Sequence, residues 1–117
     1  MTPLEFKEWE STVFGYGYGT GEPYVLQALS DFLMNCPVEG TYDYREIENT
    51  IGAQVCWLLI NVLGHADIIE YGTSPRFGWL TKKGVELRSF LAECGIEKAL
   101  GIIGSDSDEE APGGKGD

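Results

Sequence analysis

Two amphipathic helices are predicted in the first third of the chain. The first follows a capping-box pattern, in which Thr2 and Glu5 can satisfy each other's backbone N–H groups. The second begins near Pro23 and ends near Pro37, and its apolar residues follow the spacing of a helix buried on one side. The predicted inward residues are Phe6, Trp9 and Val13 in the first helix and Val25, Ala28, Leu29, Phe32 and Leu33 in the second.

The middle of the chain predicts two further helices, separated by Gly52. Asp43 and Glu46 form a second capping-box pattern that opens the shorter helix. The other spans about Gln54 to Leu63, with Gly64 as its stop. This helix carries no charge. We assign one of its apolar faces to the core, and a second apolar face must be covered by another part of the chain or by a partner. The core face is Val55, Leu58, Leu59 and Val62, and the other face is Ala53, Trp57, Ile60 and Gly64.

The pattern then changes to a β-hairpin followed by a helix. Residues 68–71 and 77–80 have the composition of short strands, and residues 72–76 between them have the composition of a turn. Thr81 can cap a last long helix, and residues 96–103 add one or two helical turns. The prediction is a mainly α fold with a small β-hairpin, of the α+β class.

The chain of 117 residues suits one compact domain with extensions at both ends. Residues 1–22 are predicted to form an N-terminal helix and a Gly/Tyr-rich loop, and residues 23–104 the main domain. Residues 105–117 are rich in Ser, Asp, Glu, Gly and Pro. They cannot bury enough apolar surface to offset the entropy lost on ordering, so a disordered acidic tail is expected.

Four short motifs follow one another in the second and third quarters of the chain. They are Tyr44–Ile47 with Gly52, Val55–Leu63, Ala66–Tyr71 and Trp79–Gly84. In this order they resemble the winged helix-turn-helix superfamily, with the resemblance running from Tyr24 to Ala92. It implies a first helix and glycine turn, a recognition helix, the entry into a wing, and the exit from the wing into the last helix. Asp67 stands where the family usually has glycine.

The segment at the recognition-helix position departs from the family. Helices that read DNA present Arg, Lys, Asn, Gln or Ser to bases and phosphates, whereas residues 53–63 contain no charge. A helix that is apolar all round must be covered on both sides. Either Phe6, Trp9 and Val13 fold back over Trp57 and Ile60, or these two residues form a protein-binding or dimerisation patch. Both interpretations disfavour ordinary insertion into the major groove.

The charge of the chain also argues against a strong grip on nucleic acid or on anionic membranes. The net charge is −11, and the tail with its five acids and one base accounts for less than half of it. One basic cluster near the predicted wing could contact nucleic acid: Arg76, Lys82, Lys83 and Arg88. One acidic set could meet a basic partner: Asp43, Glu46, Glu48, Asp67 and Glu70. Both sets could equally be solvated surface.

Few residues offer catalytic or metal chemistry. His65 is the only histidine, and Cys36, Cys56 and Cys94 lack a C-x-x-C spacing. The run Gly15–Gly21 lacks the Lys-Ser/Thr of a phosphate-binding loop and is interpreted as a linker, with Tyr16 and Tyr18 as possible stacking groups. We therefore expect no enzyme activity, no cofactor and no metal.

These patterns predict a small, acidic interaction protein without enzymatic activity. Its partner would be a protein, plausibly a component of nucleic-acid-handling machinery such as a polymerase, a nuclease or a CRISPR effector, whose basic channels suit an acidic surface. The chain also looks like a small phage or prophage regulator or inhibitor. The alternative is a DNA-binding winged-helix transcriptional regulator, and a homodimer is possible in either case. The predicted location is the cytoplasm, because no signal peptide or membrane span is visible.

Overall fold

The computed structural model describes residues 1–14 and 23–104. The predictions of a Gly/Tyr-rich linker and of a disordered acidic tail lie outside these residues. Within the described part, six helices and two short strands follow in the order α1 (Pro3–Phe14), α2 (Pro23–Met34), α3 (Tyr44–Ile51), α4 (Ala53–His65), β1 (Ile69–Glu70), β2 (Trp79–Leu80), α5 (Lys82–Cys94) and α6 (Ile96–Gly104). The prediction of a mainly helical α+β fold is confirmed.

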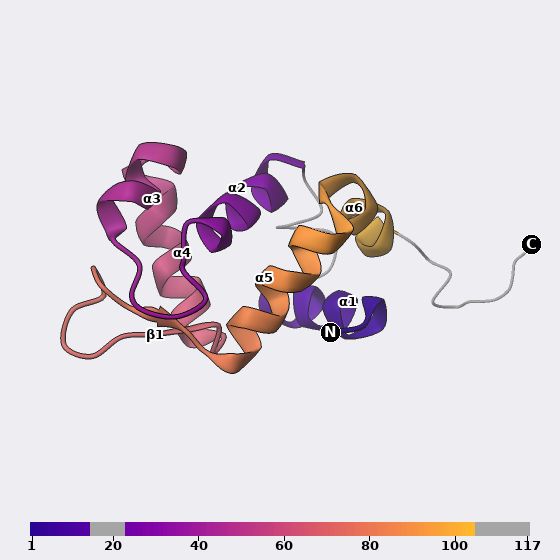
Figure 1. The fold of residues 1–117 in the computed structure, drawn as a ribbon. Coiled ribbons are helices and arrows are strands. Elements are labelled where there is room, and N and C mark those ends of the chain that lie inside the picture. Colours follow the sequence, from indigo (N-terminus) through magenta and orange to yellow (C-terminus); the bar gives the residue numbers. More distant parts are fainter. Residues whose placement is uncertain (15–22, 105–117) are drawn as a thin grey trace, which may run out of the picture.

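The helices are arranged from one end of the molecule to the other (Figure 1). Helices α3 and α4 and the hairpin form one end, helices α1 and α6 form the other, and helices α2 and α5 lie between them. Helix α2 packs against α3, α4, α5 and α6, so it links both ends. Its buried residues Leu26, Leu29, Phe32 and Leu33 lie in one continuous core with residues from every other helix.

The predicted helix caps explain where three helices begin. The Thr2 N–H donates to Glu5 Oε1 at 2.8 Å, and the Glu5 N–H donates to Thr2 Oγ1 at 3.1 Å. Asp43 caps α3 by accepting from the backbone N–H of Arg45, and Thr81 caps α5 by accepting from that of Gly84 at 3.0 Å. Each cap satisfies a backbone donor that the first helical turn leaves unpaired.

Gly52 separates α3 from α4 with a φ of +89°. This conformation strains residues that have a Cβ, so glycine allows the sharp turn between the two helices. The predicted stop at Gly64 is two residues early, since α4 continues to His65 and is capped at Ala66.

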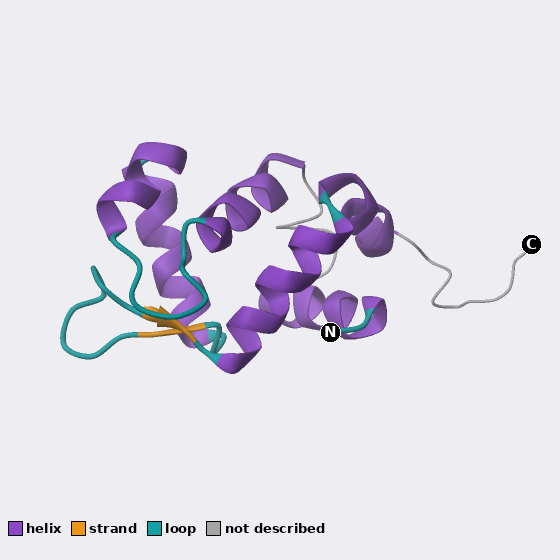
Figure 2. Cartoon of the chain, viewed as in Figure 1, coloured by secondary structure: helices purple, strands orange, loops and turns teal. Residues whose placement is uncertain are grey.

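The hairpin is shorter than the sequence predicts. Strands β1 and β2 are antiparallel, with Ile69 opposite Leu80 and Glu70 opposite Trp79 (Figure 2). The loop between them, residues 71–78, is called the hairpin loop below. Two of its carbonyl groups accept backbone hydrogen bonds from the segment before α3, Gly78 O from Tyr42 N at 2.8 Å and Arg76 O from Tyr44 N at 3.1 Å. The hairpin loop is therefore tied to the start of α3.

Candidate protein-binding surface on helix α4

Helix α4 buries a different face from the predicted one. Its buried residues are Cys56, Leu59, Ile60 and Leu63, whereas Val55 and Leu58 are exposed. The assignment of Val55 and Leu58 to the core is wrong. The prediction of Ile60 as a partner contact is also contradicted, because only 2% of this residue is accessible. An uncharged helix has no charged face to fix its rotation, so its sequence left several apolar faces as equivalent candidates for burial.

The N-terminal helix makes its main helix contacts elsewhere than on α4. Helix α1 packs against α6, and its Phe6 ring stacks on Phe90 of α5 with the ring centroids 4.9 Å apart. Helix α4 instead packs mainly against α3, with further contacts to α2. In the first of the two alternatives, Phe6, Trp9 and Val13 fold over the Trp57 and Ile60 face. In the structure, the helix that packs most extensively on α4 is α3 instead.

Trp57 lies half-buried on the side of α4 that faces α3 and the hairpin loop. Its indole Nε1 donates to Glu48 Oε2 at 2.6 Å, and its ring centroid lies 5.8 Å from that of Tyr44. The guanidinium of Arg76, from the hairpin loop, lies 6.0 Å from the Trp57 ring centroid. Trp57 is thus held by three neighbours, while part of its surface stays accessible.

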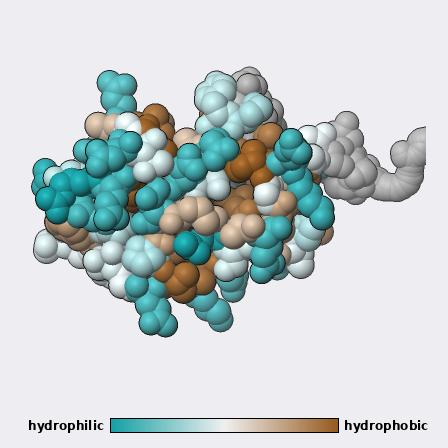
Figure 3. Space-filling view, turned by 45° about the horizontal axis from the view of Figure 1, so that its top comes forward, coloured by the Kyte–Doolittle hydropathy of each residue, from teal (hydrophilic) through white to brown (hydrophobic). Residues whose placement is uncertain are grey.

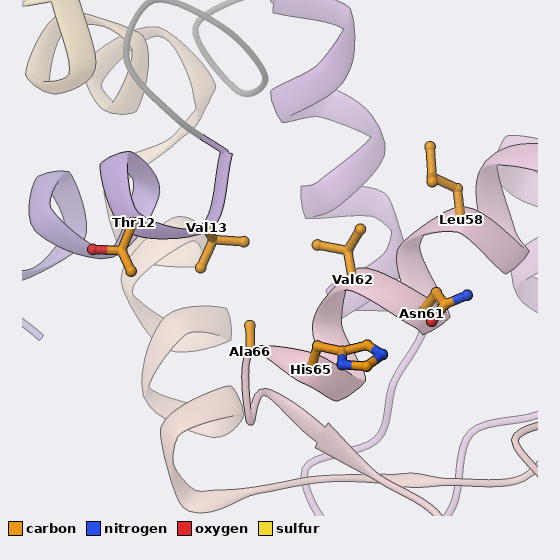
Figure 4. Close-up of a pocket in the computed structure, with 7 residues that line it drawn as sticks. All are labelled: Thr12, Val13, Leu58, Asn61, Val62, His65 and Ala66. Atoms are coloured by element: carbon orange, nitrogen blue, oxygen red, sulfur yellow. The ribbon is translucent and has the colours of Figure 1, made fainter.

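Another side of α4 lies open. Leu58 is 63% exposed, and Val55 on the preceding turn is 36% exposed. Beside Leu58, a groove of about 500 Å³ runs between α4 and the end of α1. It is lined by Thr12, Val13, Leu58, Asn61, Val62, His65 and Ala66. Figure 4 shows Val13 and Val62 pointing toward each other across this groove. Its lining contains no Asp, Glu, Lys or Arg.

A second hollow, of about 520 Å³, continues from the groove toward α5. The two share Thr12, Val13, His65 and Ala66. The lining of the second hollow adds charged residues from α1 and α5: Glu5, Glu8, Lys83 and Glu86. A partner that fills the groove with an apolar side chain would therefore meet charged groups at one end of it. Figure 3 shows one face of the molecule, on which apolar patches lie between hydrophilic side chains.

The predicted acidic set divides into residues with partners in the chain and residues that face solvent. Asp43 forms an ion pair with Arg45 at 2.9 Å, and hydrogen bonds from Arg45 lower the pKa of this carboxyl group. Glu48 accepts from Trp57, and Glu70 accepts from Trp79 Nε1 at 3.3 Å. Glu46 and Asp67 are exposed. Asp67 has a φ of +64°, a left-handed conformation that glycine and, among the other residues, Asp and Asn adopt most readily.

One residue of the predicted basic cluster, Arg88, forms hydrogen bonds within the fold. Arg88 Nε donates to two carbonyl oxygens at the end of α2, Leu33 O at 3.0 Å and Cys36 O at 3.1 Å. Arg88 is therefore a structural residue that closes the end of α2, and its prediction as a nucleic-acid contact is contradicted. The sequence shows the charge of an arginine but not which carbonyl groups the fold brings to it. Arg76, Lys82 and Lys83 are exposed.

Two of the three cysteine thiols are buried. Cys36 and Cys56 are buried, and burial raises the pKa of their thiols to about 12 and about 11. A thiol with a raised pKa is a poor nucleophile at neutral pH. Across residues 1–14 and 23–104, no three His, Cys, Asp or Glu side chains are grouped so that they could hold a metal ion. In the same residues, no helix has the length and apolar character needed to cross a membrane.

Comparisons with protein-family models, with curated proteins and with solved structures found no match. The candidate surface therefore stands on its own geometry. The sequence pointed to α4 through its lack of charge, but it did not identify Val13, Val55 and Leu58 as the accessible apolar residues. Nor did it bring Trp57 and Phe77 next to Tyr44, because these contacts join segments that are distant along the chain.

Proposed function

We propose that this chain is a small, acidic winged-helix interaction protein without enzymatic activity, which binds another protein through α4. In this proposal α3 and α4 are the helix-turn-helix unit and the hairpin loop is the wing. The observation that supports it best is the open side of α4, where Leu58 is 63% exposed beside a groove with an uncharged lining. Well-packed apolar anchors at the centre of an interface supply much of its binding energy.

The charge of the chain narrows the class of partner. A protein with a net charge of −11 is attracted to basic surfaces, and proteins that handle nucleic acids present such surfaces. We therefore place the protein among phage-type regulators or inhibitors of a polymerase, a nuclease or a CRISPR effector. Glu46 and Asp67 are the acidic residues best placed to meet that partner, since both are exposed.

The test is a comparative capture experiment in a lysate of the cells in which the protein is naturally made. Tagged wild-type protein, a Leu58→Glu variant and a Val38→Glu variant are compared by quantitative mass spectrometry. Val38 is a matched control because it is 50% exposed and lies in the loop between α2 and α3. The proposal expects a basic protein that the wild type and Val38→Glu retain and Leu58→Glu loses. Equal recovery with all three proteins would contradict a role for α4.

The alternative function is DNA binding through the wing. It is favoured by the exposure of Arg76, Lys82 and Lys83, which could contact phosphates. Phosphate contacts from three cations would release few counterions from DNA. The Kd for duplex DNA should therefore be above about 1 μM at about 150 mM salt. A fluorescence anisotropy titration over a salt series measures this. Micromolar binding with a steep salt dependence would favour the DNA-binding regulator.

A further inference from the structure

A second surface of the molecule consists of aromatic rings, and an arginine side chain of the same chain lies over them. Tyr44, Trp57 and Phe77 form it and are called the aromatic site. The Tyr44 ring centroid lies 5.8 Å from that of Trp57 and 5.9 Å from that of Phe77. Tyr44 and Trp57 are half-buried, and Phe77 is 45% exposed. This site lies where α3, α4 and the hairpin loop meet, and it shares no residue with the lining of the α1 groove.

The side chain of Arg76 rests on this aromatic site. Its guanidinium carbon lies 5.5 Å from the Tyr44 ring centroid and 6.0 Å from the Trp57 ring centroid. A cation this close to a ring face is attracted by the negative charge density of the ring. Arg45 Cζ lies 6.0 Å from the centroid of the same Tyr44 ring. The chain thus shows that these rings accept guanidinium groups.

The Arg76 side chain is not what holds the hairpin loop in place. The backbone carbonyl groups of Pro75, Arg76 and Gly78 accept from Tyr42 Oη at 2.8 Å, Tyr44 N at 3.1 Å and Tyr42 N at 2.8 Å. These bonds do not involve the guanidinium. The loop can therefore keep its position when the Arg76 side chain leaves the rings, and an arginine from another molecule can take its place.

Acidic groups beside the aromatic site favour a cationic ligand over a nucleotide. Glu48 holds the Trp57 indole through the 2.6 Å hydrogen bond, and Asp43 and Glu46 lie at the beginning of the same helix. A carboxylate can accept several hydrogen bonds, so Glu48 can accept from a guanidinium while it keeps Trp57. A phosphate would meet these carboxylates, although Arg45 and Arg76 would attract it.

We propose that the aromatic site recognises an arginine side chain of a protein partner, and that Arg76 occupies the site until that arginine displaces it. The arginine would stack on Tyr44 and Trp57, with Phe77 at the edge and Glu48 as the hydrogen-bond acceptor. This proposal rests on the proposed function only in that the partner is a protein. It does not depend on the groove beside Leu58.

The indole groups of the tryptophans allow a direct test by NMR. The probe is an acetylated and amidated peptide with one arginine between glycine and serine residues, titrated into the ¹⁵N-labelled full chain. The indole signal of Trp57 should shift, while that of buried Trp9 should not. Tyr44→Leu should weaken binding about two- to fivefold, the fold-change that corresponds to one exposed cation–π contact. Leu58→Glu should leave this binding unchanged.

The decisive comparison is between two variants that remove the same charge. Arg76→Ala frees the aromatic site, whereas Lys82→Ala removes a cation from the exposed start of α5. The proposal expects Arg76→Ala to tighten peptide binding about two- to fivefold more than Lys82→Ala does. Equal effects of the two variants would show attraction by net charge alone and would overturn it. A Trp57 signal that shifts with a single-stranded oligonucleotide but not with the peptide would also overturn it.

Discussion

Two sides of helix α4 are both apolar in the sequence, and the structure treats them in opposite ways. On the side that faces α3 and the hairpin loop, Trp57 is held by Glu48, Tyr44 and Arg76. On the side that faces the end of α1, Leu58 lies open beside the groove. The comparison shows that an apolar helix surface indicates a binding face only where the rest of the chain leaves it uncovered.

The largest difference should appear in folding stability when core and open residues of α4 are truncated. Ile60→Ala should lower the free energy of unfolding by about 2–5 kcal/mol, because it leaves a cavity in the core. Leu58→Ala should change it by less than about 0.5 kcal/mol, because this side chain is mostly in solvent. Denaturant titrations followed by circular dichroism measure both. Similar losses would mean that the two residues share one environment.

A smaller effect should separate the indole hydrogen bonds of Trp57 and Trp79. Trp57→Phe removes the 2.6 Å bond to Glu48 and should cost about 1 kcal/mol of folding free energy. Trp79→Phe is the matched control, since its 3.3 Å bond to Glu70 is longer and its side chain is 40% exposed. It should cost less than about 0.5 kcal/mol. Equal costs in denaturant titrations would show that Glu48 does not hold Trp57.

The smallest expected effect is the pH dependence of folding stability that arises from Asp43, the N-cap of helix α3, which packs on α4. Hydrogen bonds from Arg45 lower the pKa of Asp43 in the folded state. Asp43 therefore stabilises the fold above its ordinary pKa, and this contribution disappears as the pH falls through the lowered pKa. Asp43→Asn keeps a capping oxygen but does not titrate. The difference in Tm between wild type and Asp43→Asn should shrink between about pH 6 and about pH 2. A constant difference would exclude this linkage.

Local signals in the sequence predicted the fold well. The caps at Thr2, Asp43 and Thr81 and the turn at Gly52 depend on neighbouring residues, so spacing alone was enough to identify them. The hairpin was also predicted, although its strands are only two residues long. Long-range pairing decides where a ladder ends, and no local pattern contains that information.

The candidate site was predicted less well, because it depends on how the helices are rotated and on which side chains meet. Ile60 and Leu58 are both large aliphatic residues, and their exchange between core and surface follows from how α3 and α2 pack. Arg88 looked like a surface cation until the fold brought two carbonyl oxygens to it. No pattern of neighbouring residues in the sequence predicts either the exchange of Ile60 and Leu58 or the bonding of Arg88.

The most direct test of the central claim is the Kd of the captured partner, measured by calorimetry for three forms of the protein. Burying a glutamate in an apolar interface should cost more than about 1.4 kcal/mol, which is a tenfold loss of affinity. Leu58→Glu should therefore raise the Kd at least about tenfold, while Val38→Glu should leave it within about twofold of the wild type. Equal Kd values for Leu58→Glu and the wild type would contradict the assignment of α4 as the binding helix.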